Sequence, residues 1–294
     1  FFAAYFIAYE PYRAIYPDVI DDEIAARAQS TQAIWRGAGT GLALVGGGVL
    51  ISLGSAVPFA AGAAVLVVAM AVFLRVAIPR ARARARGTEP GEGAGTVAAE
   101  ARGVRDLVRE NPALRSYLAA NALWEASLGA LKTFVFLFVT VGLGRSQPEA
   151  AGIIGAIALL ILPAALISGR LADRYGRLRI MSLALPFYGV GLLVPAFTTW
   201  PPAMVPFVLV MGFGGGLIMT LPYAVLQPLM PEGRHGALTG FYSLSRGIGT
   251  ALGPLLAGIA ISVLKGPFQS TDGYAAMWLV CGGTVLASVP FLRA

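Results

Sequence analysis

Ionisable side chains inside long apolar stretches are the residues of this chain best placed to do chemistry. Glu10 and Arg13 lie three residues apart in one such stretch, and Glu125 and Lys132 lie seven apart in another. On a helix the members of each pair share a face, so their charges can neutralise each other. A carboxylate in an apolar cavity can also load and unload a proton near neutral pH. We regard Glu125 as the first candidate for that role.

Two further side chains accompany Glu125 on the same stretch. Asn121 lies about one helical turn before it, and Trp124 precedes it directly. An indole can stack on a sugar or another flat ligand, but tryptophans are also common in the aromatic belt at the membrane interface. Both charged pairs have a purely structural alternative too, in which they only neutralise each other within a helix.

Two arginines stand at corresponding positions before glycine-rich stretches. Arg36 precedes the glycines of 37–48, and Arg246 precedes those of 247–258. Close to a membrane surface an arginine can extend its guanidinium to the headgroups, which is the alternative to a role in binding. The closely spaced glycines predict that both stretches pack tightly against a neighbouring helix.

The elements that must position these residues are membrane-spanning helices. Hydrophobic residues make up 57% of the chain and charged residues 13%, whereas soluble domains have roughly 45–50% and about 25%. The apolar runs are continuous and long enough to cross a bilayer, which favours helices over the alternating strands of a barrel. The sequence predicts an all-α polytopic helix bundle with nine spans: 1–17, 30–53, 57–78, 115–142, 150–168, 179–198, 203–228, 238–264 and 273–292.

The positive charge follows the alternation of these spans. Sixteen of the 22 Lys and Arg residues lie in the gaps or at the span ends on one side, and only Arg145 and Lys265 lie on the other. This asymmetry predicts that the arginine-rich side and the C-terminus are cytoplasmic, in a plasma or inner membrane. The net charge of +7 therefore does not indicate nucleic-acid binding, and the lipid bilayer is the expected partner.

The longest gap divides the chain into three predicted parts. Residues 1–78 hold three spans, 79–114 form a cytoplasmic central loop with an amphipathic surface helix, and 115–294 hold a six-helix bundle. Because the chain starts inside an apolar stretch, we expect it to be a piece of a longer protein.

An internal repeat supports this division. Pro11-Tyr12 and Pro17 are echoed by Pro222-Tyr223 and Pro228 at an offset of 211 residues, and Arg36-Gly-Ala-Gly-Thr by Arg246-Gly-Ile-Gly-Thr at an offset of 210. Parallel repeats of this kind are a known transporter architecture. If span one corresponds to span seven, each half has six spans and the first three are missing.

A specific motif separates the fifth and sixth predicted spans. It reads Gly169-Arg-Leu-Ala-Asp173-Arg174-Tyr-Gly176-Arg177. This run resembles the signature cytoplasmic loop of the major facilitator superfamily. The resemblance implies the fold of that family without its first three helices.

The resemblance also implies a role for the signature loop as a latch between two halves. Asp173 would lie at the positive N-terminal end of span two, near residues 29–32, and Arg177 would pair with Glu232. Such contacts exist only when the halves are closed on the cytoplasmic side, so they would stabilise the outward-open state. The alternative is a loop whose positive charge only anchors the topology.

The expected function is secondary transport of a small solute by alternating access, coupled to a proton or sodium gradient. Sugar-type symport is slightly favoured over proton-coupled multidrug or metabolite efflux. Residues 11–18 are similar to segments of sugar and glycoside symporters of that family, and Gly253-Pro254 lies in the second half instead of the first. No nucleotide-binding loop, HExxH or GxSxG motif is present, so we expect neither an enzyme nor a cofactor or metal site. The sequence leaves the substrate and the oligomeric state open.

Overall fold

The computed structural model describes residues 57–79, 106–229 and 235–292, together with isolated positions between 28 and 56. Within these residues every regular element is a helix, and seven helices are long and apolar enough to cross a membrane. They confirm the seven spans predicted from 57–78 onward. The predicted span 1–17, most of 30–53 and most of the central loop lie outside the described residues.

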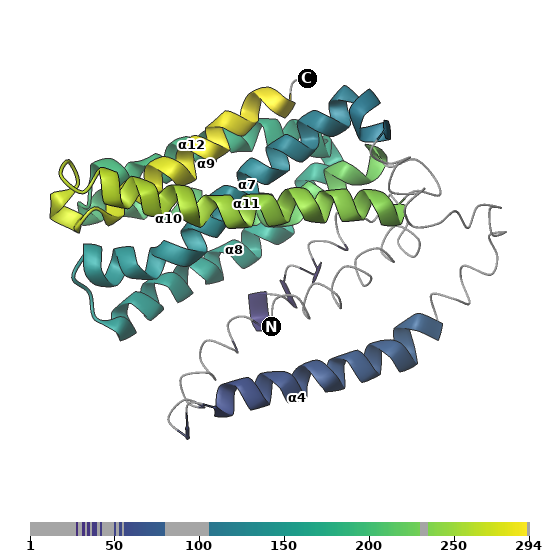
Figure 1. The fold of residues 1–294 in the computed structure, drawn as a ribbon, viewed down its shortest axis with the longest axis horizontal. Helices are drawn as coiled ribbons and strands as arrows, with labels where there is room; N and C mark the ends of the chain where they lie inside the picture. Colours follow the sequence, from purple (N-terminus) through teal and green to yellow (C-terminus); the bar gives the residue numbers. More distant parts are fainter. Residues whose placement is uncertain are drawn as a thin grey trace.

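Within the described residues, short turns join α7 to α8, α8 to α9 and α9 to α10. Figure 1 shows α7 to α12 packed as one bundle, with α4 to one side of it. The bounds of the elements are α4 Val57–Val72, continued by a π-helical turn Phe73–Ala77; α7 Pro112–Leu137, continued by Phe138–Gly142; α8 Gln147–Tyr175; α9 Arg177–Phe197; α10 Pro201–Leu226, continued by a 3-10 turn Gln227–Leu229; α11 His235–Val263; and α12 Met277–Ser288, continued by Val289–Leu292.

Helix starts follow local chemistry that the sequence already carries. Asn111 accepts a hydrogen bond from the backbone N–H of Leu114 at the start of α7, and Ser146 and Glu149 form a reciprocal capping box at the start of α8. Proline stands in the first turn of α7, α8 and α10, where its missing N–H costs no helical hydrogen bond. These caps fix where each span begins.

The signature motif is mostly helix, which differs from the loop expected. Helix α8 continues from the apolar span through Asp173 to Tyr175, and α9 begins at Arg177, so Gly176 alone forms the turn. Gly176 has φ +93°, a conformation that favours glycine. The hydropathy pattern ended the span at residue 168 because polarity begins there, but the first residue that breaks the helix comes later.

Three of the close helix pairs in the bundle bring their backbones together at glycines. These pairs are α7 with α11, α8 with α10 and α9 with α12. In the second pair a Cβ on Gly216 would lie 2.8 Å from the backbone N of Ala165, and in the third a Cβ on Gly282 would lie 2.7 Å from the carbonyl oxygen of Gly189. Lipid provides no hydrophobic drive for helices to associate, so backbones that approach this closely gain van der Waals contact instead.

The α7–α11 pair confirms the tight packing predicted for 247–258. A Cβ on Gly253 would overlap the carbonyl oxygen of Ala126, and one on Gly249 would overlap that of Ala122. From the opposite helix, a Cβ on Gly129 would lie 2.9 Å from the carbonyl oxygen of Thr250. These two helices therefore meet backbone to backbone over about one turn of α11 and about two turns of α7.

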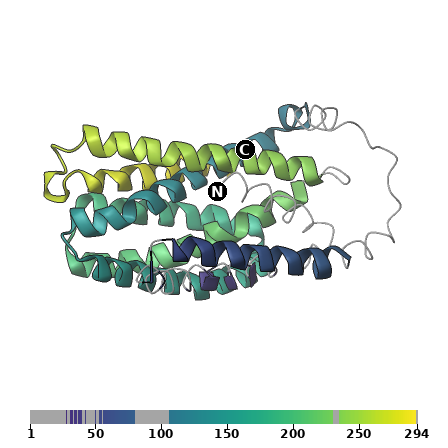
Figure 2. The same ribbon diagram turned by 60° about the horizontal axis from the view of Figure 1, so that its bottom comes forward.

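Helix α4 differs from the bundle in its surroundings. None of its residues is buried, and Figure 2 shows it along one side of the six-helix bundle. An all-apolar helix with no buried face is suited to lipid or to a partner helix. Its place in a separate N-terminal half stays a prediction.

The contact at Gly253 predicts a stability difference between two glycines of the same helix. Gly253→Ala forces the added methyl into the backbone of α7, so we expect a loss of about 1–3 kcal/mol, as for overpacked cores. Unfolding by SDS in mixed micelles measures this free energy. Gly247→Ala is the matched control, because a Cβ there meets nothing within 4 Å and alanine favours the helix by about 0.5–1 kcal/mol. Equal stabilities for the two variants would contradict the packing described.

Candidate functional site

A charged pair joins α7 to α11 beside the glycine contact. Nε of Arg246 lies 2.8 Å from Oε1 of Glu125, and their side chains are 19% and 12% exposed. A Cβ on Gly249, three residues after Arg246, would lie 2.9 Å from Cβ of Glu125. The glycine therefore allows α11 to approach closely enough for its arginine to reach the carboxylate.

This partner differs from the one expected within α7. Lys132 lies seven residues beyond Glu125, which is about 10 Å along a helix, and its side chain is exposed. Arg246 comes from another helix, at a position fixed by the packing of α7 on α11. Because the pair is largely removed from solvent, each charge depends on the other for stabilisation.

The residues around Glu125 form hydrogen bonds that bind α7 to its neighbours. The Asn121 side-chain amide donates to Oγ of Ser245 on α11 at 2.8 Å, and the Trp124 indole donates to Oγ of Ser288 on α12 at 2.7 Å. Trp124 is 1% exposed and also contacts Tyr117 edge to face. In this structure Trp124 is a core side chain, so it presents no open face to a ligand and does not lie in an interfacial belt.

Three of the predicted contact residues fall outside the described part of the chain. They are Glu10, Arg13 and Arg36. The structure therefore brings together Asn121, Glu125 and Arg246 from the predicted set. Ser245 and Ser288 were missed, because serine in a membrane helix carries no signal until a partner on another helix is known.

The signature motif lies at the end of the bundle that carries most of the arginines, which we call the arginine-rich end. Gly169 is buried within α8, whereas Asp173 and Arg174 are exposed. The Arg174 guanidinium lies 5.3 Å from the centre of the Tyr175 ring. Asp173 is thus available at the surface, as a contact to another part of the protein requires.

Arg177 is bound within the bundle. Its Nη1 donates to the backbone carbonyl of Ala224, near the end of α10, at 2.9 Å. The residue expected to pair with it, Glu232, lies outside the described residues. Arg177 therefore links the α8–α9 turn to α10, whatever else it contacts.

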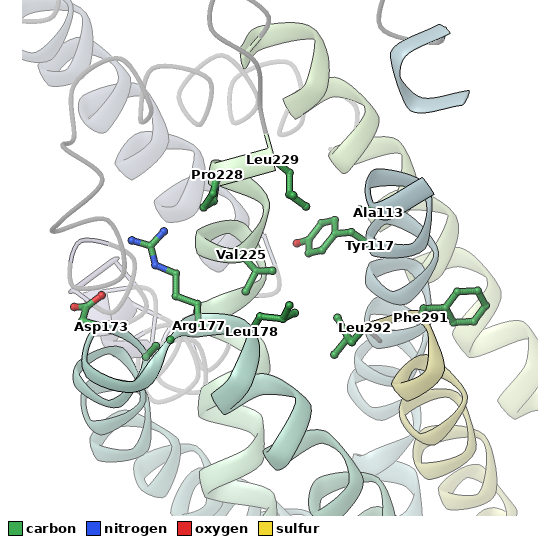
Figure 3. A pocket seen from close by; sticks show the side chains of 12 residues that line it. Ala113, Tyr117, Asp173, Arg177, Leu178, Val225, Pro228, Leu229, Phe291 and Leu292 are labelled. Atoms are coloured by element: carbon green, nitrogen blue, oxygen red, sulfur yellow. The ribbon is translucent and has the colours of Figure 1, made fainter. Parts of the chain in front are cut away.

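A cavity of about 760 Å³ opens at the arginine-rich end. Figure 3 shows Asp173 and Arg177 on one wall and apolar side chains of α7, α10 and the last turn of the chain on the others. The hydroxyl of Tyr117 donates to the carbonyl of Pro222, which fixes the ring that projects into the cavity. The lining residues are Ala113, Tyr117, Ala172, Asp173, Gly176, Arg177, Leu178, Val225, Pro228, Leu229, Phe291 and Leu292.

Comparison with known proteins identifies the family. The model of the Major Facilitator Superfamily matches residues 129–294, which is more than half of the chain. The chain belongs to the Major Facilitator Superfamily. The resemblance carried by the signature motif is thereby confirmed. The fold agrees, because the structure of a bacterial homologue of the iron transporter ferroportin, in its outward-facing state, superposes on this chain with a TM-score of 0.63 and 18% sequence identity. The match covers 95% of this chain and 65% of that one.

The relatives found by sequence are each matched over a part of their length. Multidrug resistance protein 3 of Bacillus subtilis (strain 168) is 29% identical over 93 residues, which are 32% of this chain and 18% of that protein. The triacylglyceride transporter of Mycobacteroides abscessus is 26% identical over 135 residues, 44% of this chain and 26% of its own. A putative multidrug resistance protein of Cronobacter sakazakii is 23% identical over 185 residues, 55% of this chain and 39% of its own.

Family membership and the spans together give the class of protein. This is a multi-pass membrane protein, and it belongs to a family whose members carry small-molecule solutes across the membrane. The mechanism, the coupling ion and the solute do not follow from membership of so broad a family.

The charged pair predicts strong coupling between two substitutions on different helices. Glu125→Gln leaves the Arg246 charge without its carboxylate, and Arg246→Gln does the converse, so each is expected to cost roughly 3 kcal/mol, as for broken buried ion pairs. The double variant removes both charges and should be more stable than the sum of the single effects by roughly 1–3 kcal/mol. SDS unfolding of the four proteins measures this coupling. Additive effects would show that the two side chains do not interact.

Proposed function

We propose that this protein is an ion-coupled secondary transporter that works by alternating access, with Glu125 as the carboxylate that carries the coupling proton. The observation that carries the proposal is the Glu125–Arg246 pair, with its partly enclosed carboxylate shared between two helices. Ionisable side chains are costly at membrane depth, which is why they generally serve a transport function.

The pair supplies a simple means of coupling. An arginine stays charged at any physiological pH, so in this conformation the Glu125 carboxylate faces a permanent positive charge. A solute or a helix movement that takes the guanidinium away removes that charge, and we propose that Glu125 takes up the proton at this step. Proton uptake is then linked to the conformation, as transport against a gradient requires.

We propose that the α8–α9 turn is the latch that biases this conformational equilibrium. Asp173 is exposed at the turn, where its charge can interact with the N-terminal end of a helix in the other half. That contact, with the start of the span at 30–53 as the expected partner, would stabilise the state closed on the cytoplasmic side. The same end carries the cluster of arginines, which supports its cytoplasmic placement and that of the C-terminus.

Efflux of amphipathic or apolar compounds is the best supported direction and substrate class. Two of the three relatives described above are named as multidrug resistance proteins and the third as a triacylglyceride transporter. Sugar-type symport was favoured from residues 11–18, which lie outside the described residues, and none of these three names supports it. We therefore place efflux before sugar uptake.

Transport by the reconstituted protein tests substrate class and coupling together. In proteoliposomes with an imposed pH gradient, we expect movement of an amphipathic cationic dye that a protonophore abolishes, and no gradient-driven accumulation of a radiolabelled disaccharide. Accumulation of the sugar without movement of the dye would reverse the order of the two substrate classes. If neither moved, the proposed function would be wrong.

The proton-carrying role of Glu125 predicts a separation of two transport modes. Glu125→Gln mimics the protonated carboxyl, so we expect gradient-driven dye transport to fall at least tenfold, since groups that transfer protons in enzymes contribute about 10²–10⁴-fold. Dye exchange without a gradient should persist. Glu110→Gln removes an exposed carboxylate before α7 and should change neither mode. Loss of both modes in Glu125→Gln would assign the residue to solute binding or folding instead.

The latch predicts a change of accessibility without a change of insertion. Asp173→Asn removes the charge that binds the helix terminus, so we expect the protein to insert normally but to spend more time open to the cytoplasm. Reaction of cysteines introduced at the arginine-rich end with a maleimide reagent measures that opening. Unchanged labelling together with unchanged transport would refute the latch.

A further inference from the structure

Helix α10 ends at a proline that removes one of its hydrogen bonds. In a regular helix the N–H of residue 228 would donate to the carbonyl of Ala224, four residues earlier. Pro228 has no N–H, and the N–H of Gln227 donates to the carbonyl of Tyr223. Ala224 is fully buried, with 0% of its surface exposed. A buried carbonyl without its partner is costly, because water cannot replace the missing donor.

Arg177 supplies a donor at this carbonyl. Its Nη1 lies 2.9 Å from the oxygen of Ala224, and Figure 3 shows the side chain extending from the α8–α9 turn toward the part of α10 that carries Val225 and Pro228. The guanidinium also brings a positive charge to the negative C-terminal end of the α10 dipole. Arg177 is the first residue of α9, directly after the Gly176 turn, so it reaches α10 only while that turn keeps its geometry.

The end of α10 is held by side chains from three other helices. Besides the bond from Arg177, the hydroxyl of Tyr117 on α7 donates to the carbonyl of Pro222 on α10. The hydroxyl of Tyr223 on α10 lies 3.2 Å from the hydroxyl of Thr239 on α11. Arg177 is the member of this set that comes from the signature motif. A displacement of the α8–α9 turn would therefore act on the end of α10 through this hydrogen bond, in addition to the packing of α8 and α9 on α10.

We propose that Arg177 is a positioning residue that replaces the hydrogen bond removed by Pro228 and thereby ties the latch turn to the end of α10. The consequence for transport is that α10 follows the α8–α9 turn when the latch opens, and this part of the proposal rests on the proposed function. The structural part stands by itself. It assigns Arg177 a partner on α10, in addition to the pairing with Glu232 that the sequence predicts.

The interdependence of Arg177 and Pro228 is the decisive test. Pro228→Ala restores the backbone N–H, so Ala224 no longer needs the guanidinium. The reporter is Leu226→Cys, at a fully buried position of α10, in a protein whose only natural cysteine, Cys281, is also buried. In this background the rate of maleimide labelling reports how often the end of α10 opens.

We expect Arg177→Met to increase the labelling rate on the order of tenfold, the effect of leaving one buried acceptor unpaired. Arg177→Lys, which keeps a donor, should be close to the parent. The labelling rate of the Arg177→Met, Pro228→Ala protein should lie within about twofold of the rate of Pro228→Ala alone. The ratio of these two rates is compared with the ratio of Arg177→Met to the parent, as in a double-mutant cycle. Arg179→Met removes an exposed charge two residues further on and serves as the matched control, expected to leave labelling unchanged.

An equal effect of Arg177→Met with proline or alanine at 228 would overturn the inference. So would an Arg179→Met effect as large as that of Arg177→Met, or failure of the Arg177→Met, Pro228→Ala protein to accumulate when Arg179→Met does. If Arg177→Met alone fails to accumulate and Pro228→Ala restores it, that rescue supports the inference. Transport assays on the same proteins separate the two proposals, because labelling needs no solute. If the effect of Arg177→Met on labelling depends on Pro228 but the protein transports nothing, only the proposed function is refuted. If the protein transports but the effect of Arg177→Met does not depend on Pro228, only this inference is refuted.

Discussion

The contact between α7 and α11 is the constraint on which the candidate site depends. Gly249 and Gly253 bring the backbone of α11 against the carbonyls of Ala122 and Ala126 on α7. Glu125 lies between these two alanines, and Arg246 stands one turn before Gly249, so the same approach that joins the backbones also joins the charges. In lipid, where apolar faces gain nothing by meeting, such packing and polar contacts must hold helices together. The stability of the bundle and the proposed function of Glu125 therefore depend on the same contact surface.

Prolines in the bundle create a need for hydrogen-bond donors, which a side chain from another helix can supply. Proline occurs inside α8, α9, α10 and α11, and each one removes a backbone donor that lipid cannot replace. At the end of α10 the replacement is visible, because Arg177 occupies the place of the N–H missing at Pro228. The signature motif is thus more than a surface feature of the family, since its last arginine completes the hydrogen bonding of a neighbouring helix.

Family membership and substrate are decided at different levels of the molecule. The turn at Gly176 and the arginines around it depend on backbone geometry and membrane topology, which all members of a transporter family must satisfy. The solute depends on side chains in a cavity formed between two halves, and such side chains vary freely on a constant fold. This is why the motif led directly to the superfamily, whereas the choice between sugar uptake and efflux changed once relatives were compared.

The sequence by itself determined the spans, the family and the residues with unusual charge. The length of an apolar run reflects the thickness of the bilayer, so most ends of the seven spans in the described residues were predicted to within a few residues. Helix α8 runs seven residues beyond its predicted end, because hydropathy does not show that a helix continues into polar sequence. Glu125 and Arg246 were both identified as suspects, since a charge inside an apolar run is visible without a structure.

Only the tertiary structure decided which residues meet. Arg246 as the partner of Glu125, Ser288 as the partner of Trp124 and Ala224 as the partner of Arg177 all lie on other helices, at least 47 residues away in sequence. Their encounter depends on the rotation and depth of each helix, which glycines and small side chains set through contacts summed over the whole bundle. Periodicity within one helix shows which residues share a face, but it carries no information about what that face will touch.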